Sequence, residues 1–130
     1  MLFRSDLAVW PFSGFGISDR KLAQERGQVK RYVRAQVKAL LYMLDHEEEV
    51  AQIAVDEFGM EPDIARLAVA SALRSIGRTN TGGTTGEGVA RLIEAEVRPG
   101  LPPGADIQPS QLLDLSVVEE VQRELGIRRP

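Results

Sequence analysis

The chain has 130 residues, of which 43% are apolar and 27% charged, a composition and length suited to one globular domain with a single core. Its formal net charge of -3 argues against a general nucleic-acid binder, which would be strongly basic. Because cysteine is absent, disulfides, thiolate metal sites and a thiol nucleophile are excluded.

The first 18 residues are predicted to form an irregular lead-in with one or two short strands. Residues 7–9 are one candidate strand, and residues 12–18 are the other because small and apolar residues alternate there. The start of the chain has no basic segment followed by a long apolar run, so an export signal is not expected. Made as written, the chain would stay in the cytoplasm.

Two helices are predicted next. Ser18 is placed to cap a short helix over residues 19–26, which Gly27 would end. Residues 28–44 give the clearest helical pattern, because six apolar residues recur on one stripe. These are Val29, Val33, Val37, Leu40, Leu41 and Leu44. We expect this helix to form the centre of the core.

A pair of further helices is predicted after this one. Asp45 is a candidate cap for a helix over residues 47–58, whose acidic first turn suits the positive helix end. Gly59 would end that helix, and Pro62 would begin the next one. That helix has a thin, alanine-rich apolar face, which indicates close packing between helices. The face consists of Ile64, Leu67, Ala68 and Leu73.

The C-terminal part is predicted to hold two capped helices and one turn. Residues 84–87 have the pattern of a capping box that opens a helix through residue 97, and residues 109–113 suit a single turn. A second capping box over residues 116–119 would begin a last short helix that Gly126 ends. The fold class expected is therefore mainly α, with five to six helices and one or two short N-terminal strands. The chain is expected to be a single helical domain. Residues 1–18 would form the lead-in and strand, and residues 19–126 would form the helical region.

Two charged features could carry chemistry. Lys30, Arg34 and Lys38 make one helix face basic, which could dock phosphate or an acidic partner. A solvated face is favoured, because the chain is acidic and no aromatics are interleaved. His46 could pair with Glu49 around a metal, but a single histidine is better explained as a surface turn residue. We expect no metal site, no cofactor and no nucleic-acid partner.

Residues 79–88 resemble a phosphate cradle because glycine-rich backbone precedes a helix. They lack the lysine and terminal Ser or Thr of a P-loop, so a connection with a capping box is favoured. Asp114 with Ser116 is likewise interpreted as a cap. Since no nucleophile has a partner base at a suitable spacing, we expect no enzymatic activity.

Five segments, in their order along the chain, resemble the C-terminal part of the solute-binding proteins of ABC importers. The branch concerned handles nitrate, alkylsulfonates, taurine and thiamine-pyrimidine precursors. The segments are PFSGFGIS at 11–18, QVKRYVRAQVKAL at 28–40, IAVDEFGMEPD at 53–63, GEGV at 86–89 and QPSQLLDLS at 108–116. Each one is a weak pattern alone, and the five in order are moderately specific.

The resemblance implies a type II periplasmic-binding-protein fold in the complete protein, with two α/β lobes and C-terminal helices packed on the first lobe and hinge. Such proteins are not enzymes; they bind a small solute outside the cytoplasm and pass it to an ABC permease at the membrane. This chain would be an incomplete part of such a two-lobed protein, for an anionic or heterocyclic solute. The alternative function is a standalone helical interaction module without a ligand.

Ser13, Gly14 and Phe15 are the candidate ligand-binding residues. A strand near the hinge could present a hydroxyl, a backbone amide and an aromatic face to the cleft. The competing interpretation is that Phe12 and Phe15 are core residues and that the glycines relieve crowding.

Self-association is also expected. The apolar stripe of residues 28–44 and the open edges of the strand at 12–18 would remain uncovered in this chain. We therefore expect a homo-oligomer, most simply a two-fold dimer in which the N-terminal segment of each chain packs on the helices of the other.

Overall fold

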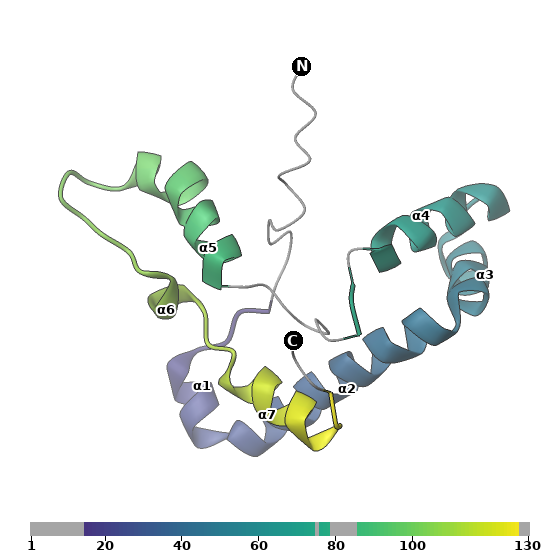
Figure 1. Cartoon of the computed structure of the whole chain (residues 1–130), viewed down its shortest axis with the longest axis horizontal. Coiled ribbons are helices and arrows are strands. Elements are labelled where there is room, and N and C mark those ends of the chain that lie inside the picture. Colours follow the sequence, from purple (N-terminus) through teal and green to yellow (C-terminus); the bar gives the residue numbers. More distant parts are fainter. Residues whose placement is uncertain (1–14, 75, 79–85, 128–130) are drawn as a thin grey trace.

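The computed structural model describes residues 15–74, 76–78 and 86–127, and this part of the chain is mainly helical (Figure 1). The predicted mainly α fold class is confirmed. The elements are α1 (Asp19–Gln24), α2 (Arg26–Asp45), α3 (Glu47–Phe58), α4 (Pro62–Arg74), α5 (Gly86–Leu92), the π-helical turn η2 (Ile93–Val97), the 3-10 turn η3 (Arg98–Gly100), α6 (Pro109–Leu112) and α7 (Ser116–Glu124).

Strands are absent from the described residues, in contrast to the minor strand component that the sequence predicted. Residues 7–9 and 12–14 of the two candidate strands lie outside this part, while residues 15–18 are unpaired. Ser18 has extended backbone angles and caps α1, because its hydroxyl accepts a hydrogen bond from the Lys21 amide at 3.3 Å. The predicted cap is confirmed, and the backbone before it leads into a helix instead of pairing.

Helix α2 forms the base of the molecule and connects two arms (Figure 1). Helices α3 and α4 pack as a hairpin at its C-terminal end. Helices α5 and α6 pack on each other in the second arm, and α7 returns to lie along α2. None of the helices in the described residues is both long and apolar enough to cross a bilayer.

The buried side chains form separate groups along these elements instead of one core around α2. On the predicted stripe of α2 only Val37 is fully buried, and the other five residues are half-buried. The stripe therefore faces its neighbours, as predicted, and at its C-terminal end Leu44 packs against a buried cluster whose members belong to α3 and α4. Its two halves serve different partners, because α7 packs on α2 and the α3–α4 hairpin packs at its end.

Several predicted helix ends are confirmed. Gly59 follows α3 with φ of 64°, a left-handed conformation that favours glycine, and its amide donates to the Val55 carbonyl at 3.0 Å. Pro62 is the first residue of α4, where its missing amide hydrogen is harmless. Gly126 is also left-handed, after α7.

Other ends differ from the prediction. Helix α1 ends at Gln24, and Gly27 lies in the first turn of α2 instead of separating the helices. Asp45 is the last residue of α2 and not a cap, because its carboxylate pairs with Arg78. Residues 84 and 85 of the first capping box lie outside the described part.

At α7 the N-cap position is Leu115, which makes no side-chain cap hydrogen bond, and Asp114 precedes it. Ser116 is the first helical residue, and its amide donates to Asp114 Oδ1 at 2.8 Å. This hydrogen bond lowers the pKa of Asp114. The interpretation of Asp114 with Ser116 as a cap is therefore confirmed, with the carboxylate as the acceptor.

Candidate functional site

Of the three predicted ligand-binding residues, only Phe15 lies within the described structure. Ser13 and Gly14 lie outside the described residues, whereas Phe15 is 75% exposed. Its ring contacts Tyr32 of α2 edge to face, with centroids 5.2 Å apart. Phe15 is thus not a core residue, so that interpretation is wrong for it; the exposed ring lies against Tyr32 at the surface of α2. We call Phe15 and Tyr32 the aromatic edge.

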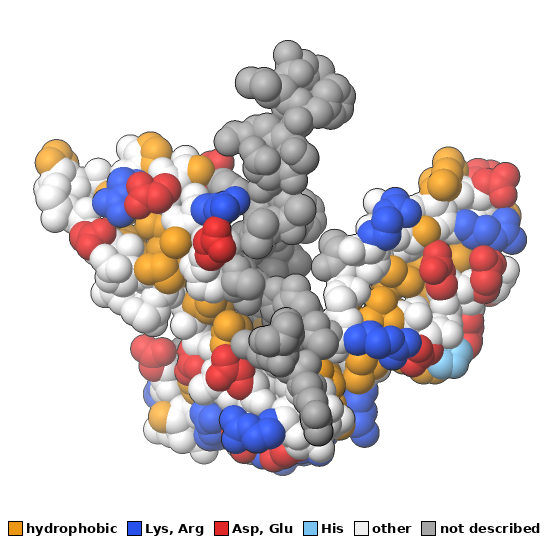
Figure 2. Space-filling model, viewed as in Figure 1, with side chains coloured by type: hydrophobic (Ala, Val, Ile, Leu, Met, Phe, Trp, Pro, Cys, Tyr) orange, Lys and Arg blue, Asp and Glu red, His pale blue; other side chains and the backbone are white. Residues whose placement is uncertain are grey.

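The basic side of α2 faces the acidic side of α7. Lys30 Nζ lies 2.5 Å from Glu120 Oε1, and Arg26 lies 3.1 Å from the other oxygen of the same carboxylate. Lys30 and Arg34 also pair with Glu124. We call these five residues the charge ladder. Figure 2 shows basic and acidic side chains interspersed over this base of the molecule.

The charge ladder changes the interpretation of the basic stripe. Lys38 is exposed as expected, but Lys30 and Arg34 are bound by carboxylates of the same chain. The hydrogen bond from Lys30 lowers the pKa of Glu120, and the hydrogen bonds to Glu120 and Glu124 raise the pKa of Lys30. Since Lys30 and Arg34 are already paired with carboxylates of α7, this part of the face is suited to holding α7 and not to docking phosphate.

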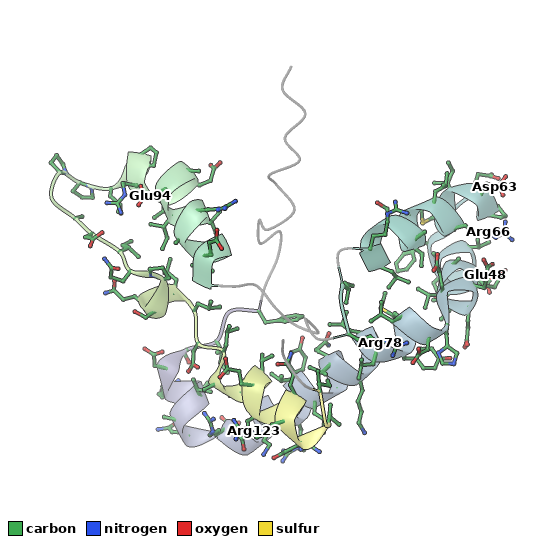
Figure 3. The ribbon with its side chains drawn as sticks, in the orientation of Figure 1. Glu48, Asp63, Arg66, Arg78, Glu94 and Arg123 are labelled. Carbon is green, nitrogen blue, oxygen red and sulfur yellow. The ribbon has the colours of Figure 1, made fainter. Side chains whose placement is uncertain are left out.

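A second polar cluster lies at the corner between α2 and α3. The His46 ring stacks on Tyr42 with centroids 3.9 Å apart, and His46 Nδ1 lies 2.9 Å from the Tyr42 carbonyl oxygen. Tyr42 Oη donates to Glu49 at 2.6 Å, which raises the pKa of Tyr42. Asp45 is paired with Arg78, labelled in Figure 3, and this hydrogen bond lowers the pKa of Asp45.

This corner is a surface junction. His46 is exposed at the bend between two helices, as expected from the sequence. Glu49, its possible partner at a metal, is held by Tyr42 instead. Within the described residues no group of three His, Cys, Asp or Glu side chains is arranged to hold a metal ion.

Two depressions occur beside α3 and α4. The smaller one, next to Arg66, has room for a single water molecule. The larger is a shallow, open hollow whose apolar floor includes Leu44 and Leu73, with Glu47 and Arg74 also lining it. Neither of these two depressions encloses a solute.

The exposed side of α4 was not distinguished from its buried side in the sequence. We call it the α4 outer face and define it by Ile64, Leu67, Ala68 and Ser71. All four are exposed, Ile64 by 55% and Leu67 by 68%. Three of them were assigned to a single packed face with Leu73, but only Leu73 is buried.

The side of α4 that does pack is one of smaller residues. Ala65, Val69 and Leu73 recur every four residues and are buried, and Val69 and Leu73 pack with Ala51 of α3. Small side chains let the two helices approach closely. The signal in the sequence was this second stripe at four-residue spacing, which leaves Ile64 and Leu67 on the other side of the helix.

Charged residues from the N-terminal halves of α3 and α4 meet on one side of the hairpin. Arg66 donates to Glu48 at 3.3 Å and to Asp63 at 3.2 Å, and Figure 3 labels all three residues. The side chain of Asp63 is 93% exposed, so this carboxylate remains open to a further cation. Exposed pairs of this kind contribute little to folding.

Comparison with protein-family models, with curated proteins and with solved structures gave no match to this chain.

Proposed function

We propose that this chain is the C-terminal helical part of an ABC-importer solute-binding protein and has a non-catalytic role in capturing a small anionic or heterocyclic solute. In the complete protein, the partners would be that solute and an ABC permease, and the protein would act outside the cytoplasm.

The order of the helices supports this proposal. The segment at 28–40 lies within α2, and the segment at 53–63 spans the end of α3 and the start of α4. The segment at 86–89 opens α5, and that at 108–116 runs from α6 to the start of α7. Four of the five resembling segments therefore coincide with helices or their ends, in the order of the resemblance.

The observation that carries the proposal is the position of the helix-breaking residues in these segments. Gly59 is left-handed and Pro62 begins α4, both within the segment at 53–63. Asp114 caps α7 within the segment at 108–116. The helix ends of the described structure therefore fall at the helix-ending residues of the resembling segments, which is the arrangement that the proposal requires.

The aromatic edge is the surface we assign to the solute side. Ser13 and Gly14 immediately precede Phe15, whose exposed ring is supported by Tyr32. A flat heterocycle could stack on such a ring, and a hydroxyl or backbone amide next to it could bind an anionic group. Tyr32 would then contribute to solute binding from α2, although it was not a candidate from the sequence.

The test joins the full chain to the N-terminal lobes of a taurine- or pyrimidine-binding protein, in place of that protein's own C-terminal segment. We expect one cooperative thermal transition whose midpoint rises with the solute, since a ligand that binds only the native state stabilises it. The chain alone should show no shift with taurine, nitrate or an aminopyrimidine. The proposal is contradicted if the α2 amides of the joined protein exchange hydrogen as fast as in the chain alone.

Two tyrosines on α2 provide a matched pair of variants for the joined protein. Tyr32 and Tyr42 are each 44% exposed, but only Tyr32 contacts Phe15. Tyr32→Ala should reduce the solute-dependent rise in the midpoint, and Tyr42→Ala should leave it unchanged. Equal effects of the two substitutions would remove the aromatic edge from the solute site.

A helical interaction module without a ligand is the second candidate function. The α4 outer face favours it, because monomers rarely leave neighbouring large apolar side chains uncovered without a functional reason. A protein that never responds to a solute, yet forms a specific complex through α4, would support this candidate over the first.

A further inference from the structure

We infer that the α4 outer face binds the same face of a second copy of the chain, as an antiparallel pair of α4 helices about a two-fold axis. This inference goes beyond the proposed function. The α4 helix belongs to the hairpin arm at the C-terminal end of α2 (Figure 1), whereas the aromatic edge consists of Phe15, which precedes α1, and Tyr32, in the N-terminal half of α2.

The shape of the surface suits a helix. Ile64, Leu67, Ala68 and Ser71 have the spacing of one helical stripe and are all exposed. The opposite side of α4 is already buried against α3. A helix that is apolar on two sides is typical of one packed between two neighbours, and in the described structure only one of these sides is covered.

The size of the side chains allows close contact. Ala68 and Ser71 are small and would let a second helix approach to about 8 to 10 Å between axes. Ile64 and Leu67 extend beyond them and could interdigitate with the corresponding residues of the second copy. The α4 outer face thus has large apolar side chains beside small ones, so the large residues of one copy can pack against the small residues of another.

The charges fix the orientation of the pair. Asp63 lies in the first turn of α4 and Arg74 is its last residue. They are about three helical turns apart and therefore share one flank of the helix. In an antiparallel pair, Asp63 of each copy would lie opposite Arg74 of the other. In a parallel two-fold pair, the flanks of the two copies would lie on opposite sides of the interface, and Asp63 and Arg74 would have no partner across it.

This arrangement identifies the occupant as a second copy. A two-fold interface requires a patch that is complementary to itself. The α4 outer face has an apolar, neutral middle with an acid at one end and a base at the other, so it matches itself after a half-turn. The exposed Asp63 carboxylate is available for the second cation while it contacts Arg66.

The first experiment is sedimentation equilibrium at micromolar to about 100 μM concentrations. The wild-type chain should associate as a dimer, and Leu67→Glu should weaken dimerisation at least about ten-fold, because it places a charge in the apolar middle. Leu112→Glu is the matched control, since Leu112 is 55% exposed on α6. A monomeric wild-type chain, or equal effects of the two substitutions, would overturn the inference.

The second experiment tests the orientation by charge reversal. Asp63→Arg alone and Arg74→Asp alone should each weaken dimerisation, because like charges would then face each other. An equimolar mixture of the two variants should form a heterodimer, since both cross-pairs are attractive again. Circular dichroism establishes that each variant remains helical. A mixture that associates no better than either variant alone would overturn the antiparallel pairing.

Discussion

The two ends of α2 are stabilised by different means. At one end α7 packs on α2 with Val117 and Val121 buried and with the charge ladder along the contact. At the other end α3 and α4 form a local hairpin whose core contains Ala51, Val69 and Leu73. The first contact joins segments about ninety residues apart in sequence, and the second joins neighbours.

The two contacts differ in how their register is set and in how much apolar surface they leave uncovered. A contact between distant segments must select its register, and paired charges at successive turns provide that selection without adding much stability. A hairpin has its register fixed by the short turn between the helices. The α7 end satisfies its charged and apolar groups within the chain, whereas the hairpin end leaves the α4 outer face uncovered.

The largest effect is expected from Val121→Ala. Val121 is fully buried, so removing two carbons leaves a cavity between α7 and its neighbour and should cost about 2 kcal/mol. Val118→Ala, at a half-buried position of the same helix, should cost less than half as much. Urea unfolding at a protein concentration below dimerisation measures both. Equal losses would mean that α7 is not held by its buried side.

Adding side-chain volume to the core of the hairpin tests its packing, whereas the Val121 substitution removes volume. Ala65 is fully buried in α4, and Ala65→Leu should cost about 1.5 kcal/mol because the closely packed α3 cannot move away without loss of contacts. Ala35→Leu, at an exposed position of α2, is the control and should be nearly neutral. If Ala65→Leu is also neutral in urea unfolding, the hairpin is packed more loosely than the contacts of Ala51, Val69 and Leu73 indicate.

Two glycines provide a smaller test of helix ends. Gly59 is left-handed, so Gly59→Ala should destabilise the chain by about 1 kcal/mol. Gly27 lies within α2 and an added Cβ would meet only ordinary contact distances, so Gly27→Ala should stabilise the chain by about 0.5 kcal/mol. Thermal unfolding should give shifts of opposite sign, and shifts of the same sign would contradict these helix boundaries.

The smallest effect concerns pH and the charge ladder. The pKa of Glu120 is lowered from 4.5, so its contribution to stability is present above pH 4.5 and is lost as the pH falls through the lowered value. The pKa of Lys30 is raised from 10.5, so its contribution is present below that pH and is lost as the pH rises through the raised value. Both contributions are therefore complete at neutral pH.

Thermal unfolding between pH 7 and pH 3 measures how the contribution of Glu120 to stability is lost in acid. Glu120→Gln should reduce the fall of the midpoint with acid, and Glu57→Gln on α3 is the control because Glu57 is exposed and outside the ladder. High salt should reduce the effect of the ladder, since exposed charges are screened. Identical pH profiles for the wild type and Glu120→Gln would show that Glu120 does not contribute to the attachment of α7.

The features that were predictable from sequence are those determined locally. Ser18, Gly59 and Pro62 mark helix ends through hydrogen bonding and backbone angles that depend on nearby residues alone. The mainly α class followed from these signals and from the helical spacing of apolar residues. The end of α1 was misplaced because Gly27 is tolerated in the first turn of a helix.

The partners of each face were not predictable in the same way. Lys30 and Arg34 appeared solvated because their carboxylates lie about ninety residues further along the chain. The buried side of α4 was misassigned because both sides are apolar, and only the tertiary contact with α3 decides which side is covered. At the candidate site, the exposure of Phe15 depends on how the chain crosses α2, which no local pattern encodes.

Hydrogen exchange at two protein concentrations tests the contrast between the two ends of α2 most directly. Protection of the α7 amides should be the same at about 1 μM and about 100 μM, because that contact lies within one chain. Protection of the α4 amides should increase at the higher concentration, because the second copy covers the α4 outer face. Concentration-dependent protection of α7, or α4 protection that does not change, would contradict this account.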